Sequence, residues 1–465
     1  MKLLKKILMI LLLPFLGVAW SPQAQAIPAF ARQVGMPCSA CHFQHFPVIN
    51  SFGRAFKEGG FTMVGSENLI TGDNNGKDIS LPTVLNAAIE LYNGYVKTNG
   101  PTAGSTPTTQ TTNNGQWQLP GSSSVFFGGR VNQHTGFEAE LNMYPTPAGL
   151  LNVKVPLAYT IGDGSWNLGA TVYSTGVYGP SFGMETMDTG ANAVHLFNQF
   201  DMPAISAAQY INTSTPAAGI DLYLANPDVG FIVLGSWMPD QAPSSGNLTS
   251  TYVRAALTND SLINGWDLGL GFQIFGGHAV STADIPGTVG GGQNDFGDFF
   301  ASPFASQPAP VPGVFNTKAY EIDAQALGSI GKYPLTLIAS YANAPSDGAP
   351  SGVTDGFQGN LFNPGTATRS SFNVAAEFGV IPNKATIQLG YRNAKSGFAI
   401  PGTTITNATD NAVLVGATYA MTLNVRLDLT YSHYSGQLYD AVSQNLQGNG
   451  YAGNDTLQAW LITAF

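Results

Sequence analysis

The sequence predicts an all-β fold: a transmembrane antiparallel β-barrel of about sixteen strands, with a small, mainly helical N-terminal module acting as its plug. Three observations predict it. Apolar and polar residues alternate with a period of two through most of the chain, only 10% of residues are charged, and the chain begins with an export signal. A soluble domain carries roughly 25% charged residues. The formal net charge of −10 argues against a nucleic-acid-binding surface, which would be basic.

The first element is a signal peptide. Three lysines within the first six residues precede an apolar run over 7–20, and Ala24-Gln25-Ala26 has the small-x-small form of a cleavage site. We therefore expect residues 1–26 to be removed on export. No later stretch reaches the ~18 uninterrupted apolar residues of a membrane-spanning helix. Any membrane residence must then come from strands.

Both cysteines of the chain lie in one motif, Cys38-Ser39-Ala40-Cys41-His42. C-x-x-C-H is the attachment sequence of a c-type haem, in which two thiols bind the haem vinyl groups and the adjacent His becomes an iron ligand. A disulfide would not require His42, and a thioredoxin-like redox pair would need a βαβ context that the flanks do not show. A zinc knuckle would need further ligands nearby. We expect one covalently bound haem, with iron held by His42.

A helix is expected after the motif, because apolar residues recur there at steps of three and four. Pro47 suits its first turn and Gly59-Gly60 would end it. We expect the stripe to line the haem pocket, since so short a module has little other core. The stripe consists of Phe46, Ile49, Phe52 and Phe56. The module itself is expected over 27–80.

A sixth iron ligand would distinguish electron transfer from gas binding. Met36 lies too near Cys38 to reach the distal face, and His45 would crowd the face of His42. Met63, beyond the helix, can fold back over the haem, and Met/His ligation would raise the redox potential. Met63 is therefore our predicted second iron ligand. His45, or no ligand, remains open, and gap filling is the ordinary role of a Met.

The barrel is expected over 81–465, where strands of ~9–11 residues alternate apolar and polar side chains. Acidic residues fall on the face opposite the apolar one, and we expect them to face the lumen. They are Glu138, Glu140, Asp267, Glu321, Asp323, Glu377 and Asp428. The favoured interpretation is that they hydrate the lumen and pair with arginines, in preference to forming a path for iron. Those arginines are Arg130, Arg254, Arg392 and Arg426.

Turns and aromatic residues complete the barrel pattern. Segments 98–124, 281–316 and 343–368 are expected as long outer loops, and Gly331-Lys332 and Pro382-Asn383 as short turns at the other end. The final strand ends on Phe465, as bacterial outer-membrane barrels do. We expect aromatic residues at strand ends to form interface girdles. The residues in question are Tyr92, Tyr95, Trp166, Tyr173, Tyr431 and Tyr434.

The N-terminal region also resembles a known family. Residues 27–33 (Ile-Pro-Ala-Phe-Ala-Arg-Gln), the haem motif, residues 46–54 and Gly60-Phe61 are similar to the fused outer-membrane monohaem cytochrome c–porins. That family is best known from bacteria that oxidise ferrous iron outside the cell. The resemblance implies one haem, a porin-like barrel, and electrons passed from extracellular Fe(II) to a periplasmic c-type cytochrome. Its haem residues correspond to Cys38, Cys41 and His42.

These parts together predict an electron-transfer protein of the bacterial outer membrane, with the haem module in the lumen or on the periplasmic side. Its partners would be outer-membrane lipid, extracellular Fe(II) or another one-electron donor, and a periplasmic c-type cytochrome or similar acceptor. No residue is assigned a catalytic role. If the protein is an enzyme, it is a ferrous-iron-oxidising cytochrome. The alternatives are an ion or nutrient porin with a structural or sensory haem, and a haem enzyme or gas binder.

Overall fold

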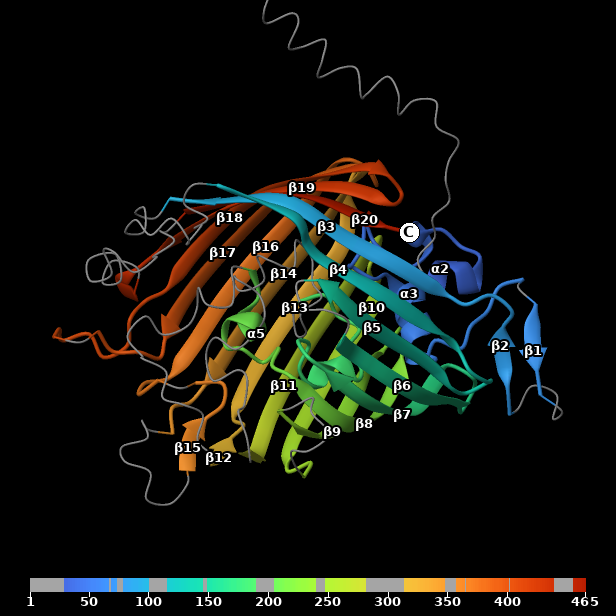
Figure 1. Cartoon of the computed structure of the whole chain (residues 1–465), viewed down its shortest axis with the longest axis horizontal. Coiled ribbons are helices and arrows are strands. Elements are labelled where there is room, and N and C mark those ends of the chain that lie inside the picture. The colour runs from blue at the N-terminus through green and yellow to red at the C-terminus, as the bar shows by residue number, and fades with distance from the viewer. Residues whose placement is uncertain are drawn as a thin grey trace, which may run out of the picture.

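The computed structural model describes most of the chain after the predicted signal peptide, residues 1–26, which lies outside it. The described residues are 29–66, 68–72, 78–99, 115–144, 149–189, 205–239, 247–281, 313–347, 357–363, 365–400, 402–438 and 455–465. In this part the chain forms a closed barrel whose wall contains sixteen antiparallel strands (Figure 1). The predicted antiparallel barrel and its strand number are confirmed.

The wall strands follow one another around the barrel in chain order. Two further short strands lie between wall strands in sequence, but the wall strands on either side of each of them still pair directly. The wall strands are β3 (Ala87–Thr98), β4 (Gln116–Arg130), β5 (Gly136–Tyr144), β6 (Gly149–Ile161), β7 (Trp166–Thr175), β8 (Ala217–Asn226), β9 (Gly230–Met238), β10 (Ser250–Ile263), β11 (Trp266–Ser281), β13 (Ala319–Ile330), β14 (Tyr333–Ala344), β16 (Arg369–Ile381), β17 (Ala385–Ser396), β18 (Asn411–Thr422), β19 (Val425–Ser435) and β20 (Asp455–Ala464). The short strands β12 (Gly313–Asn316) and β15 (Phe357–Asn360) pair with each other in parallel.

The last strand closes the barrel on the first. β20 pairs antiparallel with β3, from Thr456 opposite Thr98 to Ala464 opposite Glu90. Beyond the strand, Phe465 and Ile89 exchange backbone N–H to carbonyl bonds of 2.9 and 2.6 Å. No edge of the wall is left open, which a structure embedded in lipid requires because nothing there can satisfy unpaired backbone groups.

The two ends of the barrel differ. At one end the strands are joined by turns of two to five residues. The predicted turns at 331–332 and 382–383 are among them, the second extending to residue 384. The chain enters β3 and leaves β20 at this same end. At the other end most connections are long, although only four residues join β5 to β6. One of them, between β7 and β8, folds inward and carries η3 (Pro180–Phe182) and α5 (Ala207–Tyr210), whose residues are buried. In Figure 1 the C-terminus lies beside α2 at the short-turn end.

Burial along the wall is inverted relative to a soluble protein. On β13, Glu321 and Asp323 are 1% exposed, whereas Ile322 between them is 54% exposed. The same alternation holds on β16, β17 and β19, with Glu377, Arg392 and Asp428 buried. A polar inside and an apolar outside are the pattern of a barrel that resides in lipid. The predicted inward orientation of the acidic residues is confirmed.

Three of the six residues predicted for the aromatic girdle do not lie on the outer face of the barrel. Tyr92, Tyr173 and Tyr434 are at most 6% exposed and face the lumen. Tyr431 is 42% exposed and faces outward. Successive side chains on a strand point to opposite faces, so these three tyrosines point into the lumen. Aromatic side chains there help to fill the barrel interior.

Two further expectations need correction. The loop predicted over 98–124 ends sooner, because β4 begins at Gln116. The helix predicted from Phe46 begins instead at Ser51, as α3 (Ser51–Glu58), where the Asn50 side chain accepts a hydrogen bond from the Gly53 N–H at 3.0 Å. An Asn cap of this kind fixes the first turn, and Phe46, which precedes a proline, is disfavoured in helical conformation. Gly59 ends the helix as expected.

The other elements before the barrel are small. They are α2 (Ala29–Val34), η1 (Cys38–Ala40) and a hairpin of β1 (Leu69–Thr71) and β2 (Ser80–Pro82) that projects beyond the short-turn end (Figure 1). None of the described helices has the length and apolar character needed to cross a bilayer.

The inverted burial makes a prediction about the outer face. Leu222, in the middle of β8, is 57% exposed, and an arginine there would have to enter hydrocarbon. Leu222→Arg should lower the free energy of unfolding from lipid vesicles by about 2–4 kcal/mol. The matched control is Leu423→Arg, at the β18–β19 turn, where the leucine is 72% exposed; near the interface the cost should be about 0–1 kcal/mol. Equal effects at both sites would contradict a lipid-facing wall.

Candidate functional site

Residues 29–66, here called the N-terminal segment, lie against the inner face of the barrel at the short-turn end. Phe30 of α2, Phe56 of α3 and Phe61 form one aromatic cluster, with ring centroids 4.7 to 5.6 Å apart. Phe30 also packs on Gly128 of β4, where an added Cβ would lie 2.7 Å from the ring. A Cβ added at Gly136 of β5 would lie even closer to the carbonyl oxygen of Gly60. The segment thus builds its small core partly from the wall.

Polar contacts fix the segment to several sides of the barrel. Toward β4, Gln33 accepts the Arg130 N–H at 2.9 Å. Toward β8, the Tyr223 hydroxyl donates to the Glu58 carbonyl at 3.0 Å. Toward β11, Arg54 forms an ion pair with Asp267 at 2.6 Å, and it also donates to the Pro227 carbonyl of the β8–β9 turn at 3.2 Å. Further contacts with β14, β16 and β19 come from Gln44, His45 and Phe46.

The inward loop between β7 and β8 reaches the segment from the opposite side. The Ile49 N–H donates to Oδ2 of Asp188 at 2.9 Å, and the Asp188 N–H donates to Gln325 of β13 at 2.8 Å. Burial raises the pKa of Asp188 to about 7. The loop and the segment therefore meet inside the lumen.

The C-x-x-C-H motif forms a compact turn braced by α3. The N–H of His42 donates to the Cys38 carbonyl at 2.9 Å, which closes η1. Asn50, which caps α3, also donates its amide to the Ala40 carbonyl at 3.0 Å. Gly53 lies directly on the Cys41 carbonyl, where a Cβ would come within 2.4 Å of the oxygen. Glycine is thus required at 53 for the motif to rest on the helix.

The imidazole of His42 is oriented by its own chain. Its Nδ1 lies 3.2 Å from both the Pro47 and the Val48 carbonyl oxygens. Carbonyls only accept, so Nδ1 carries the proton and Nε2 keeps its lone pair. Burial lowers the pKa of His42 to about 4, although the two carbonyls oppose this shift. A neutral imidazole with a free Nε2 is the form that ligates a metal.

The two thiols suit the same role. Cys38 and Cys41 are free and half-buried. Burial raises the pKa of both thiols, so they are protonated at neutral pH. Two unpaired thiols beside an imidazole with a free Nε2 are the donor set that covalent haem attachment needs, and the residues present fit that group. A disulfide between them is not formed in this structure.

The candidates for the sixth ligand lie in different settings. Met63 is 40% exposed, and its carbonyl accepts the Gln33 amide at 2.6 Å. Met36 is also 40% exposed. His45 turns to the barrel wall, where Nε2 lies 2.7 Å from the Glu377 carboxylate and Nδ1 lies 3.0 Å from the Arg426 guanidinium. His45 is thus engaged by the wall, whereas both methionine side chains are accessible.

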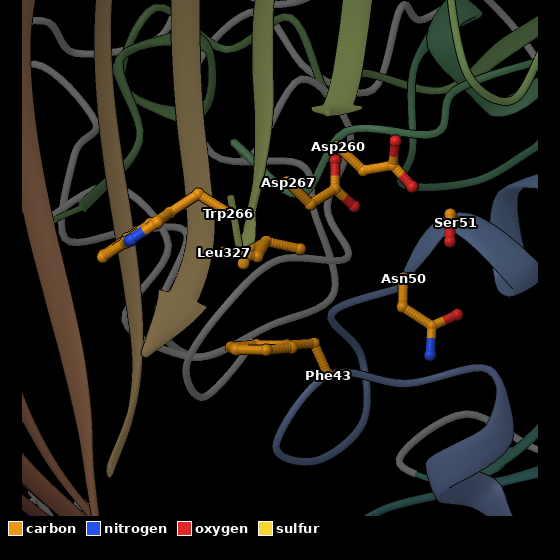
Figure 2. Close-up of a pocket in the computed structure, with 8 residues that line it drawn as sticks. Phe43, Asn50, Ser51, Asp260, Trp266, Asp267 and Leu327 are labelled. Atoms are coloured by element: carbon orange, nitrogen blue, oxygen red, sulfur yellow. The ribbon is translucent and has the colours of Figure 1, made fainter. Parts of the chain in front are cut away.

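A pocket of about 310 Å³ lies between the segment and the wall (Figure 2). Figure 2 shows Phe43 and Leu327 along one side, and the carboxylates of Asp260 and Asp267 facing Asn50 and Ser51 of the segment. Phe43 follows His42 directly, so the pocket adjoins the motif.

Three of the seven predicted inward acids pair with an arginine, namely Asp267, Asp323 and Asp428. The other four, Glu138, Glu140, Glu321 and Glu377, contact lysine, histidine or neutral polar groups instead. Arg254 contacts both Asp323 and Glu185 at 2.8 Å. Arg426 pairs with Asp428 at 2.8 Å. Two of the pairings differ from those expected. Arg392 pairs with Asp410, and Arg130 donates to the Thr62 carbonyl at 2.9 Å.

The histidines of the barrel region, His134, His278 and His433, form no common site in the described part of the chain. His134 stacks on Tyr159, and His433 contacts Asp455 at 2.6 Å. His195 lies outside the described residues.

The residues that hold the segment were missed by sequence reasoning. Gln33, Gln44, Asn50 and Arg54 all contact the wall or the motif. Of these, Asn50 carried a usable signal, since Asn before an amphipathic run is a common helix cap. The wall partners of the others lie at least 97 residues away in the chain, and nothing in a single sequence pairs them.

Comparisons with known proteins give a limited result. No protein-family model and no curated protein sequence matches the chain. Among solved structures, OmpF of Salmonella typhi in complex with daunomycin is 14% identical over 83% of this chain and 98% of its own, with a TM-score of 0.47. The outer membrane channel DcaP of Acinetobacter baumannii is 8% identical over 82% and 97%, with a TM-score of 0.45. An anion-selective porin from Comamonas acidovorans is 12% identical over 82% and 98%, with a TM-score of 0.44.

The buried ion pair of Arg54 predicts how firmly the segment is held. Arg54→Ala would leave the Asp267 carboxylate without its partner, and breaking a buried pair from one side costs about 3–5 kcal/mol. Proteolysis in residues 29–66 should accelerate while the barrel remains resistant. The control is Lys318→Ala, because Lys318 is 48% exposed and its contact with Asp347 is 3.3 Å long; this change should cost about 0–1 kcal/mol. Equal protection in both variants would show that Arg54 does not anchor the segment.

Proposed function

We propose that the chain is an electron-transfer protein of the bacterial outer membrane. The N-terminal segment is a c-type haem module lodged as a plug in the short-turn end of the barrel. Cys38 and Cys41 attach the haem, and His42 and Met63 are the iron ligands. The observation that carries the proposal is the neutral His42 imidazole, whose Nδ1 is held by two carbonyls so that Nε2 is free beside two unpaired thiols.

A haem held by Cys38, Cys41 and His42 would supply one-electron chemistry, with Fe(II) oxidised to Fe(III) as donor and an oxidised periplasmic protein as acceptor. The residues of the chain hold and orient it. The barrel supports the proposal physically, because an apolar band of ~25 Å separates donor and acceptor. A polypeptide that crosses the band and carries a haem at one end shortens the distance over which the electron must travel.

The orientation follows from the ends of the barrel. Bacterial outer-membrane barrels have short turns on the periplasmic side and long loops outside. The N-terminal segment lies at the short-turn end, so we place the haem on the periplasmic side, within reach of a c-type cytochrome or similar acceptor. Fe(II) as the donor is proposed from the family resemblance. The lumen charges do not supply the argument, because Asp323 and Asp428 are paired with arginine.

A second candidate is an ion or nutrient porin whose haem is structural. The closed barrel with a polar inner face is the architecture of a porin, and taken alone it supports this candidate more directly than electron transfer. The contacts of the segment with β4, β8, β11 and β16 favour a closed lumen instead.

Anaerobic mixing with Fe(II) tests the main proposal. The full chain, purified in the oxidised form, should carry the added mass of one haem, and its haem bands should reduce within seconds of mixing. The control is the double variant Cys38→Ala, Cys41→Ala, which should lack both the added mass and the bands. A chain that carries haem and stays oxidised with Fe(II) would overturn iron oxidation. Ion conductance of the same chain in planar bilayers, typical of an open pore, would support the porin instead.

The identity of the second iron ligand predicts a spectroscopic difference. Met63→Ala should open the sixth position, so that carbon monoxide binds the reduced haem and the redox potential falls. Met36→Ala is the matched control, because Met36 is equally exposed and should leave both properties unchanged. Carbon monoxide binding by the unaltered chain would mean that Met63 does not ligate, and would favour a gas binder.

A further inference from the structure

The turn that follows His42, residues 43–48, is held by the barrel wall. The amide of Gln44 donates to the Thr336 hydroxyl of β14 at 3.0 Å and to the Glu377 carbonyl of β16 at 3.3 Å. Next along the turn, Nε2 of His45 lies 2.7 Å from the Glu377 carboxylate. The Arg426 guanidinium of β19 then donates to the Phe46 carbonyl at 2.5 Å. Three consecutive residues are thus bound by three strands.

The wall residues that make these contacts are themselves immobilised. Glu377 is fully buried and accepts hydrogen bonds from the Thr386 hydroxyl at 2.6 Å and the Gln388 amide at 2.9 Å. Arg426 forms two bonds of 2.8 Å with the Asp428 carboxylate, in the bidentate geometry that fixes a guanidinium plane. Both groups therefore present the turn with rigid partners.

The far end of the same turn orients His42. The carbonyl oxygens of Pro47 and Val48 accept hydrogen bonds from Nδ1–H, each at an N···O distance of 3.2 Å. Val48 also accepts the Phe43 N–H at 2.8 Å, so the turn closes on itself across its base. The Phe46 ring stands edge-on to the imidazole at 5.4 Å between centroids. One continuous set of contacts runs from the wall, through the turn, to the imidazole.

We propose that Glu377 and Arg426 are positioning residues for the axial imidazole: the barrel wall sets the orientation of His42 and the strength of its Nδ1 hydrogen bonds through the turn 43–48. The inference rests on the proposed haem function and deepens it. A carbonyl that accepts a hydrogen bond from Nδ1–H makes Nε2 a more basic ligand and would stabilise the oxidised iron. Releasing the turn weakens that bond, so the redox potential should rise and the ring should take several orientations.

The test compares wall variants in the full-length, haem-loaded chain. Glu377→Ala and Arg426→Ala should each raise the midpoint potential and split the low-spin electron paramagnetic resonance signal into more than one species. Gln44→Ala, which removes only the bonds to Thr336 and to the Glu377 carbonyl, should produce a smaller shift in the same direction. Glu377→Gln keeps an oxygen that can accept from His45, and should restore most of the original signal.

Two matched controls remove buried charges from the wall elsewhere. Arg392→Ala breaks a pair with Asp410 of the β17–β18 connection, and Glu321→Ala removes a carboxylate that is 1% exposed and contacts Gln273 of β11. Both should leave the potential and the spectrum unchanged. Retention of folded barrel on heating in detergent identifies any variant that fails to fold, and Gln44→Ala then carries the test.

The outcomes separate this inference from the proposed function. If none of the chains carries the added mass of haem, the proposed function fails. If haem is present and Glu377→Ala, Arg426→Ala and Gln44→Ala all match the unaltered chain in potential and spectrum, the proposed function stands and the positioning role is wrong. If the controls shift as much as the test variants, the effect belongs to the barrel in general and the inference is also wrong.

Discussion

The constraint on which the structure depends is the need to pair every backbone N–H and carbonyl inside lipid. A closed ring of strands meets it, and here the ring closes where β20 pairs with β3 and Phe465 bonds to Ile89. Closure has a consequence for side chains. Because residues alternate between faces, every outward apolar residue has a neighbour that points into the lumen. The barrel therefore creates an inner surface of polar groups that need partners, and the N-terminal segment supplies many of them.

Much of the fold was predictable because a period of two is a local property. The alternation of Tyr320, Ile322 and Glu321 can be read in a few residues, and so can a turn such as Gly331-Lys332. The face of the strand to which a given aromatic side chain points was harder to predict. Tyr92 and Tyr434 are as aromatic as Tyr431, yet they face the lumen, since composition does not tell which face a residue takes. The start of α3 was misplaced because four apolar residues at helical spacing concealed the cap at Asn50.

The candidate site was predictable only in its first part. Cys38, Cys41 and His42 lie together in sequence, and their spacing carries the chemistry. The groups that orient His42 are of two kinds. The carbonyls of Pro47 and Val48 are backbone atoms, which no sequence motif marks. Glu377 and Arg426 lie more than three hundred residues away, and they reach the turn only because the strand register places them at the short-turn end.

The site and the barrel are consequently one structure. A segment as short as residues 29–66 can bury too little surface to fold alone, and it makes up the deficit from the wall at Gly128 and Gly136. The wall in turn contains buried charges whose partners lie in the segment. Asp267 would be unpaired without Arg54, and Glu377 would lose a hydrogen bond without His45. Breaking such buried contacts costs several kcal/mol each, so assembly of the lumen and ordering of the C-x-x-C-H turn are coupled. A haem attached to this turn would be held in a geometry that the barrel imposes.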